Sequence, residues 1–355
     1  MTMKRKFQVR WLIAIALFGS VAMTPVVASA SVGTKTLFSV AKRLSLGNCG
    51  PGASIAALDT SSIFLTGTFS CDKVTPADLI RVNRVTLKVV ARVTLPSVTS
   101  VAYGDNALWW ATGAPLGNAG TTLTPGHGRL LLKVDPTSLK VTGRFKLPGA
   151  TELVTVVRGN VWVATPTSLF RVNPENGAII ATVHLGYFPA ALAGSYNGAW
   201  LYVLGGARPE SHLVLSVFSS VSGRLLGTRR NPNFSDGPFA VVRGGVWVPV
   251  QNTKTQSTTV RLFKGRGFAP SSSLRKFTFD TNAYAGDGIL WLIDAGGIGP
   301  TVCASPANGV VRARGGPVGV EYDAMAFDGR GTYLLRSIGL NQSLLQIVPS
   351  TGCSR

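Results

Sequence analysis

The sequence predicts an all-β protein, a seven-bladed β-propeller with four-stranded antiparallel blades whose ring is closed by an amino-terminal strand. Three observations lead to this fold class. A short apolar segment with a central aromatic residue recurs along the chain, as in ALWWATG from 107, NVWVATP from 160 and VWVPVQ from 246. Each recurrence lies among other short segments rich in β-branched residues and bounded by Gly, Pro, Asn or Asp, which indicates strands joined by turns. The last repeat unit has no fourth strand at the carboxyl end of the chain, and a segment with the fourth-strand pattern precedes the first unit at the amino end.

The recurring aromatic residues give the repeat its period. They are Phe64, Trp109, Trp162, Trp200, Trp247, Trp291 and Tyr333, with separations of 45, 53, 38, 47, 44 and 42 residues. An aromatic residue at the same register of every unit is typical of core between blades rather than of a sugar-stacking set. Each unit also has an opening strand, a third strand such as LFRVNPENG and a fourth such as AIIATVHLG. Four short strands at a period near 45 residues describe one propeller blade.

A single propeller domain is expected over 31–355, because all-β architectures of this length form one unit. Its blades are expected at about 51–96, 97–148, 149–186, 187–232, 233–279, 280–317 and 318–355. The last blade ends with SLLQIVPSTG and has no fourth strand, whereas SVAKRLSLG at 39–47 has the fourth-strand pattern. We therefore expect 39–47 to pair into the last blade, which removes an exposed sheet edge.

The first thirty residues have the pattern of a secretory signal peptide. MTMKRKFQVR is basic, WLIAIALFGSVAM is an apolar run, and Ala28, Ser29 and Ala30 form a small-residue cleavage signature. The prediction is a signal peptide over 1–30 and a protein that is secreted or held in the periplasm or cell envelope, with no membrane span after cleavage. An uncleaved amino-terminal anchor is the alternative, because 11–30 carries no charge and could span a bilayer.

The chain carries a net charge of +20, from 35 basic and 15 acidic residues. Without the four basic residues of the signal peptide, 31 basic residues remain against the same 15 acids, and they are scattered, with no run longer than a pair such as Arg229-Arg230. Nucleic-acid binding predicts clustered Lys and Arg, so no nucleic-acid partner is expected. The imbalance comes from few carboxylates, which suits an acidic exterior because carboxylates lose their ion pairs near pH 4. We expect a monomer.

A resemblance to a known group of propellers follows from the repeat motifs. The recurring xVWVA strand, xVxPxxG turn and xVVAxVxLP strand resemble the seven-bladed repeats of the YVTN, NHL and virginiamycin B lyase-like superfamily, over essentially the whole mature chain. The resemblance implies that the first strand of each blade lines the central channel. It also implies that the loops between second and third strands lie on the top face, with the connections between blades. These motifs specify blade packing rather than chemistry.

Four cysteines in a chain predicted to be exported indicate two disulfides, and the residues alone leave three connectivities open. The resemblance implies that Cys49 and Cys71 both lie on the top face, which pairs them. Cys303 and Cys353 are then left to bond each other and fix the carboxyl end.

Motifs of known catalytic mechanisms are missing. The sequence has no GxSxG elbow, HExxH pair, glycine-rich phosphate loop or CxxC metal spacing. The resemblance implies that a lyase would need a histidine and carboxylates over the channel with Mg²⁺. The three histidines do not meet this need, because His184 lies in an expected fourth strand and His127 and His212 lie in loops.

Acidic residues gather at the expected channel mouth. The start of the channel-lining strand lies ten to twelve residues before each aromatic residue, and five of the 15 acidic residues occur there: Glu152, Asp236, Asp280, Glu321 and Asp323. Turn-forming Asp at strand starts is one explanation. The other is a carboxylate ring for a hard cation such as Ca²⁺ or Mg²⁺. The expected metal ligands are Asp236, Asp280 and Asp323.

Aromatic residues adjoin the same mouth and would supply the walls of a pocket: Tyr187, Phe188, Tyr284 and Tyr322. The sequence thus favours an exported, non-catalytic propeller that binds a small molecule, a peptide or a cell-envelope component, with cation dependence at the mouth. A metal-dependent lyase or lactonase-type enzyme using the same mouth is the alternative.

Overall fold

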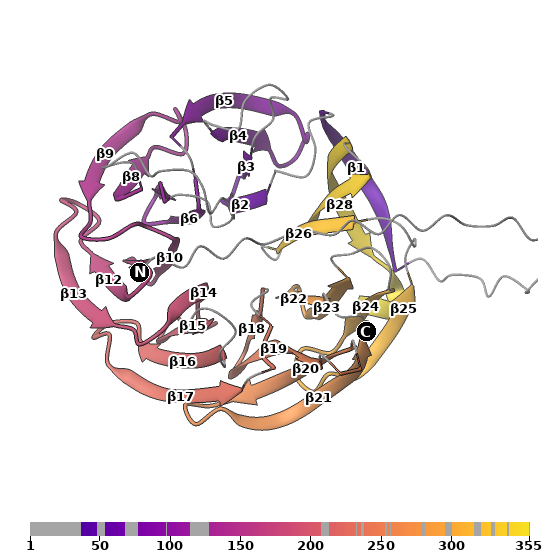
Figure 1. Ribbon diagram of the computed structural model, residues 1–355. Coiled ribbons are helices and arrows are strands. Elements are labelled where there is room, and N and C mark those ends of the chain that lie inside the picture. The colour runs from indigo at the N-terminus through magenta and orange to yellow at the C-terminus, as the bar shows by residue number, and fades with distance from the viewer. Residues whose placement is uncertain are drawn as a thin grey trace, which may run out of the picture. The chain divides into compact units, whose positions relative to one another are not determined.

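The computed structural model describes residues 37–47, 54–67, 77–96, 98–113, 128–206, 213–231, 233–235, 238–252, 254–255, 257–277, 281–294, 300–315, 321–327, 331–338 and 341–354. They belong to one compact unit, Thr34–Arg355. The expected signal peptide at 1–30 lies outside these residues. Seven four-stranded antiparallel sheets follow one another around a ring, which confirms the predicted propeller (Figure 1).

In blades 1 to 4 the strands follow chain order from the channel outward (Figure 1). Blade 1 contains β2 (Ser54–Leu58), β3 (Ser62–Gly67), β4 (Ala77–Asn83) and β5 (Val89–Leu95). Blade 2 contains β6 (Ser100–Gly104), β7 (Ala107–Ala111), β8 (Leu130–Val134) and β9 (Val141–Lys146). Blade 3 contains β10 (Leu153–Val157), β11 (Asn160–Ala164), β12 (Ser168–Val172) and β13 (Ile179–His184). Blade 4 contains β14 (Phe188–Gly194), β15 (Trp200–Gly206), β16 (Leu213–Ser219) and β17 (Leu225–Asn231).

The remaining blades keep this order until the ring closes. Blade 5 contains β18 (Ala240–Val242), β19 (Gly245–Asn252), β20 (Ser257–Lys264) and β21 (Ala269–Phe277). Blade 6 contains β22 (Thr281–Gly286), β23 (Ile289–Asp294), β24 (Thr301–Ala304) and β25 (Val311–Gly315). Blade 7 contains β26 (Glu321–Phe327), β27 (Thr332–Ile338), β28 (Asn341–Pro349) and, as its outer strand, β1 (Phe38–Gly47). The antiparallel pairing of β1 with β28 confirms the predicted ring closure.

A short helix, α1 (Thr351–Ser354), follows β28. Among the residues that the structure describes, no helix is long and apolar enough to cross a bilayer.

In blades 1 to 4 the turns between third and fourth strands are built alike. The amide of the fifth residue donates to the carbonyl of the first, as from Leu87 to Asn83 (2.8 Å) and from Leu139 to Asp135 (2.9 Å). The side chain of the first residue accepts from amides that follow it, and Asp135 Oδ1 lies 2.6 Å from the Ser138 amide. Hydrogen bonds from Ser138 lower the pKa of the Asp135 carboxyl. In these four blades the local bonds fix the end of the third strand and the start of the fourth.

The aromatic residue of each blade is buried at the junction with the next blade. The seven hydrophobic clusters of the core each contain one such residue together with apolar residues from the following blade's second and third strands. Trp247 of blade 5, for example, packs with Leu290 and Val302 of blade 6. The core is therefore distributed over the junctions rather than held within single blades.

The strand register corrects one predicted aromatic position. Tyr202, not Trp200, lies opposite Val217 in blade 4, at the register where Trp162 lies opposite Arg171 in blade 3. Tyr202 is 1% exposed, whereas Trp200 is only half-buried. The turn before β15 causes the shift, because four residues, 196–199, separate the facing pair in blade 4 and only two, 158–159, do so in blade 3.

A disulfide joins the last two blades. Cys303 of β24 bonds Cys353 of α1, across 50 residues of chain, and the carbonyl of Cys353 also accepts a hydrogen bond from Arg312 (2.8 Å). Cys49 and Cys71 lie outside the described residues, so their pairing stays a prediction.

The double substitution Cys303→Ser and Cys353→Ser should lower the free energy of unfolding by up to about 4 kcal/mol, because the disulfide closes a loop of 50 residues. Guanidinium unfolding of both proteins, with and without a reducing agent, measures this. With reducing agent, the wild type should approach the variant measured under the same conditions, and equal midpoints of the two proteins without reducing agent would contradict the expectation.

Tyr202→Ala should lower the free energy of unfolding by about 3–5 kcal/mol, because it empties a fully buried aromatic position. Trp200→Ala serves as the matched control and should cost less than half as much, since Trp200 keeps contact with solvent. Urea unfolding of the two variants gives the two free energies. An equal decrease in both would contradict the assignment of Tyr202, rather than Trp200, as the buried aromatic residue of blade 4.

Candidate functional site

A cavity of about 490 Å³ lies in the central channel. Residues on or beside the inner strands of every blade except the third line it, and Figure 1 shows these strands around the centre of the ring. Its larger side chains are Ile55, Leu58, Tyr103, Phe239, Tyr284, Met325 and Phe327, and alanine and glycine provide much of the remainder. No Asp, Glu, Lys, Arg or His is among the described residues that line it. The side chains on its walls are thus apolar apart from two phenol groups, whereas polar atoms, those of the backbone included, make up the larger part of its exposed surface.

The predicted carboxylates lie at or before the starts of inner strands where the structure describes them. Glu152 directly precedes β10, is 8% exposed, and donates its amide to the carbonyl of Ala164 (2.8 Å). Glu321 and Asp323 belong to β26, although their side chains lie outside the described part. Within the described part of the chain, no three His, Cys, Asp or Glu side chains are grouped to hold a metal ion. The carboxylate ring stays a prediction, because two of its members lie outside the described residues: Asp236 and Asp280.

The predicted aromatic residues divide between two places. Tyr284 of β22 lies opposite Trp291 and lines the central cavity. Phe188 begins β14, and Tyr322 lies in β26 with a side chain outside the described part. Tyr187 lines a different cavity, between blades 3 and 4.

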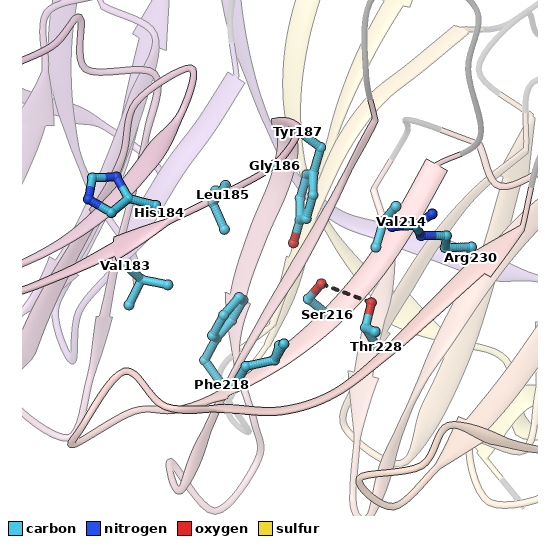
Figure 2. A pocket seen from close by; sticks show the side chains of 11 residues that line it. Val183, His184, Leu185, Gly186, Tyr187, Val214, Ser216, Phe218, Thr228 and Arg230 are labelled. Atoms are coloured by element: carbon cyan, nitrogen blue, oxygen red, sulfur yellow. Dashed lines mark hydrogen bonds between the residues drawn. The ribbon is translucent and has the colours of Figure 1, made fainter.

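This second cavity, the blade 3–4 pocket, has a volume of about 460 Å³. One wall is the end of β13 and the connection to β14, and the other is formed by β16 and β17 (Figure 2). Figure 2 shows the Tyr187 hydroxyl pointing toward Ser216. The lining residues are Val183, His184, Leu185, Gly186, Tyr187, Val214, Ser216, Phe218, Leu225, Thr228 and Arg230.

Strand alternation explains which side chains of blade 4 line this pocket. Val214, Ser216 and Phe218 occupy every second position of β16 and therefore share one face. Antiparallel pairing places Arg230 opposite Val214 and Thr228 opposite Ser216. The hydroxyls of Ser216 and Thr228 lie 3.4 Å apart. The face thus runs from a cation through two hydroxyls to an apolar end.

The pocket holds a buried phenol and a cationic rim. Burial raises the pKa of Tyr187 to about 12, although the Ser216 hydroxyl opposes the shift, so the phenol is neutral at physiological pH. Arg230 is exposed at the rim, and no Asp or Glu is among the lining residues.

His184 also lies at the rim, but Figure 2 shows its ring turned away from Tyr187 and Ser216. Its Nδ1 lies 3.4 Å from Ser168 Oγ. His184 is therefore directed toward its own blade rather than into the pocket.

Comparison with known proteins supports the fold. No protein-family model matches the chain, and no curated protein matches it. Among solved structures, a catalytically inactive virginiamycin B lyase from Staphylococcus aureus, solved with quinupristin, shares 14% identity at a TM-score of 0.62, covering 88% of this chain and 100% of its own. BamB from Moraxella catarrhalis shares 11% identity at a TM-score of 0.53, over 87% and 99% of the two chains. BBS1N, solved in complex with ARL6DN, shares 13% identity at a TM-score of 0.64, over 90% and 99%. At such identities the likeness extends to the propeller fold alone, which carries enzymes and binding proteins.

Proposed function

We propose that the chain is an exported, non-catalytic β-propeller that binds a small molecule or a peptide at its central channel. The observation that carries this proposal is the cavity of about 490 Å³ in the channel, which combines apolar and aromatic side chains with exposed backbone polar groups. Cavities of this size that join apolar and aromatic side chains to hydrogen-bonding groups are typical of ligand sites. An aliphatic or aromatic part of a ligand would be removed from water on entering the cavity, which favours binding. The Tyr103 and Tyr284 hydroxyls would orient the ligand through hydrogen bonds.

The carboxylates expected at the mouth would give this site a polar, cation-dependent rim. Glu152 lies directly before the inner strand of blade 3, and β26 of blade 7 begins at Glu321. Asp236 and Asp280 precede the inner strands of blades 5 and 6 in the sequence. Oxygen ligands converging from several blades would suit Ca²⁺ or Mg²⁺.

A metal-dependent lyase or lactonase-type enzyme at the same mouth is the second candidate, favoured by the fold shared with virginiamycin B lyase. The carboxylates would then be metal ligands and base. Incubating the purified protein with lactones and cyclic esters, in Mg²⁺ or Ca²⁺, separates the candidates. Ring-opened product by mass spectrometry would establish the enzyme and overturn the non-catalytic proposal.

The predicted export can be tested by determining the amino terminus of the protein after production in a secreting host. The full chain produced in a secreting host should appear in the medium or cell envelope with a mature terminus near Ser31, because cleavage is expected after Ala30. Intact-mass measurement checks this. An uncleaved chain in the membrane fraction would support the amino-terminal anchor instead.

The double substitution Asp236→Asn and Asp280→Asn should abolish stabilisation by divalent cations, because it removes two charged ligands from neighbouring blades. At a cation concentration a hundred times Kd, the wild type should gain roughly 4 °C in Tm, and the double variant should gain nothing. Thermal unfolding in Ca²⁺, Mg²⁺ and EDTA measures the difference.

Without cation, the double variant should unfold at or above the wild-type temperature, because losing two like charges relieves repulsion. Asp105→Asn with Asp135→Asn, two turn positions outside the expected ring, is the matched control and should keep the full cation response. A cation response that survives in the Asp236 and Asp280 variant would rule out the proposed ring.

A further inference from the structure

One position at the junctions between blades holds a large side chain in most blades and a small one in blade 4. In each third strand, the residue directly before the partner of the buried aromatic residue faces the preceding blade. We call it the junction position. Its occupants in blades 1 to 7 are Ile80, Leu132, Phe170, Ser216, Arg261, Val302 and Leu345. In blades 1, 2, 3, 6 and 7 the occupant is a buried apolar residue that belongs to a junction cluster.

Ser216 explains why a pocket exists between blades 3 and 4. Protein interiors are close-packed, so replacing a large aliphatic side chain by a small one leaves a void unless the walls collapse. Ser216 is 2% exposed and lines the 460 Å³ pocket. In blade 5 the half-buried Arg261 holds the same position, and an arginine stem is long enough to cover apolar surface as an aliphatic residue does. Blade 4 thus has the smallest occupant of the seven.

We propose that the blade 3–4 pocket binds a small amphipathic carboxylate, with the aliphatic or aromatic body against Leu185 and Phe218 and the carboxylate toward Arg230. The residues that line this pocket and those that line the central cavity do not overlap, so the site is separate from the proposed channel site.

The charges and hydrogen-bonding groups favour an anion over a neutral or cationic ligand. Arg230 provides a guanidinium whose fork fits a carboxylate, and no Asp or Glu is among the lining residues to attract a cation. The hydroxyls of Ser216 and Thr228 lie along the paired strands between Arg230 and Phe218, and the Tyr187 hydroxyl points toward Ser216 (Figure 2). These hydroxyls can donate to an ester, ether or hydroxyl oxygen.

The apolar part of the site favours a ligand with a hydrocarbon body. Leu185 and Phe218 are 7% and 3% exposed, and Val183 and Val214 flank them. Leu225 also lines the pocket, is 52% exposed, and would be covered by a bound ligand. Burial of hydrocarbon against these side chains supplies the affinity, and Arg230 supplies the preference for an anion.

The test uses three probes of equal chain length: octanoate, octan-1-ol and octylamine. Isothermal titration with the mature protein at pH 7 should show octanoate binding about threefold to fivefold more tightly than octan-1-ol, the usual gain from one solvent-exposed ion pair. Octylamine should bind more weakly than both. Absence of octanoate binding, or octylamine binding as tightly as octanoate, would overturn the proposal.

Ser216→Leu should abolish binding of octanoate and octan-1-ol, because it places in blade 4 the leucine that fills the junction position of blades 2 and 7. Its Tm should equal or exceed that of the wild type, since the leucine fills a void. If this variant does not fold, Ser216→Val, which copies Val302 of blade 6, replaces it and should weaken octanoate at least tenfold. Wild-type affinity in a folded variant would show that octanoate binds elsewhere.

Arg230→Gln should reduce octanoate affinity threefold to fivefold and leave octan-1-ol unchanged. Lys146→Gln is the matched control, because Lys146 occupies the same register in blade 2, where Leu132 fills the junction. It should change neither affinity, and an equal loss in both variants would mean that octanoate responds to overall charge rather than to this site. The Asp236 and Asp280 double variant should bind octanoate as the wild type does, so failure of the channel proposal leaves this one standing.

Discussion

The junction between adjacent blades is the contact on which the rest of the structure depends. A four-stranded sheet has two faces to cover, and in a ring each face is covered only by a neighbouring blade. Each of the seven core clusters therefore joins one blade's aromatic residue to apolar residues of the next. Ring closure follows from the same need, because Tyr333 of blade 7 packs with Ile63 and Leu65 of blade 1. Without β1, blade 7 would expose the outer edge of β28.

The junctions also show which acceptors the basic side chains find in a chain with few carboxylates. The third-strand residue opposite the aromatic residue faces the following blade, and in three consecutive blades it is a cation that donates to a backbone carbonyl in the next blade's outer turn. The pairs are Arg81 with Pro136 (3.2 Å), Lys133 with Pro174 (2.9 Å) and Arg171 with Val221. Carbonyls do not titrate, so these contacts persist at pH values that protonate carboxylates. In blade 6 the same register holds Cys303, whose disulfide to Cys353 makes the corresponding link covalent.

The sequence predicts the features that repeat and misses those that depart from the repeat. Turn residues and β-branched residues recur with the same period in every unit. This period predicts the seven blades and the closing strand. The aromatic register fails once, where the longer turn at 196–199 puts Trp200 two residues before the buried Tyr202. The repeat pattern does not show that this turn is two residues longer, so it favours the more conspicuous tryptophan. Tyr187 was predicted as a site residue, but its place in the blade 3–4 pocket depends on side-chain packing that the pattern does not contain.

Ser216 shows how a signal for such a pocket can be found in a repeat protein. A serine in a strand has no meaning by itself, since short polar residues occur in many strands. Its meaning comes from the third strands of the other blades, which hold isoleucine, leucine, phenylalanine, arginine, valine and leucine at the same register. Stability requires this position to be filled at most junctions, because each unfilled one forfeits packing. A single small residue there leaves the fold supported by the other junctions, so in a propeller a lone exception at a packing position marks where a cavity can exist without loss of the ring.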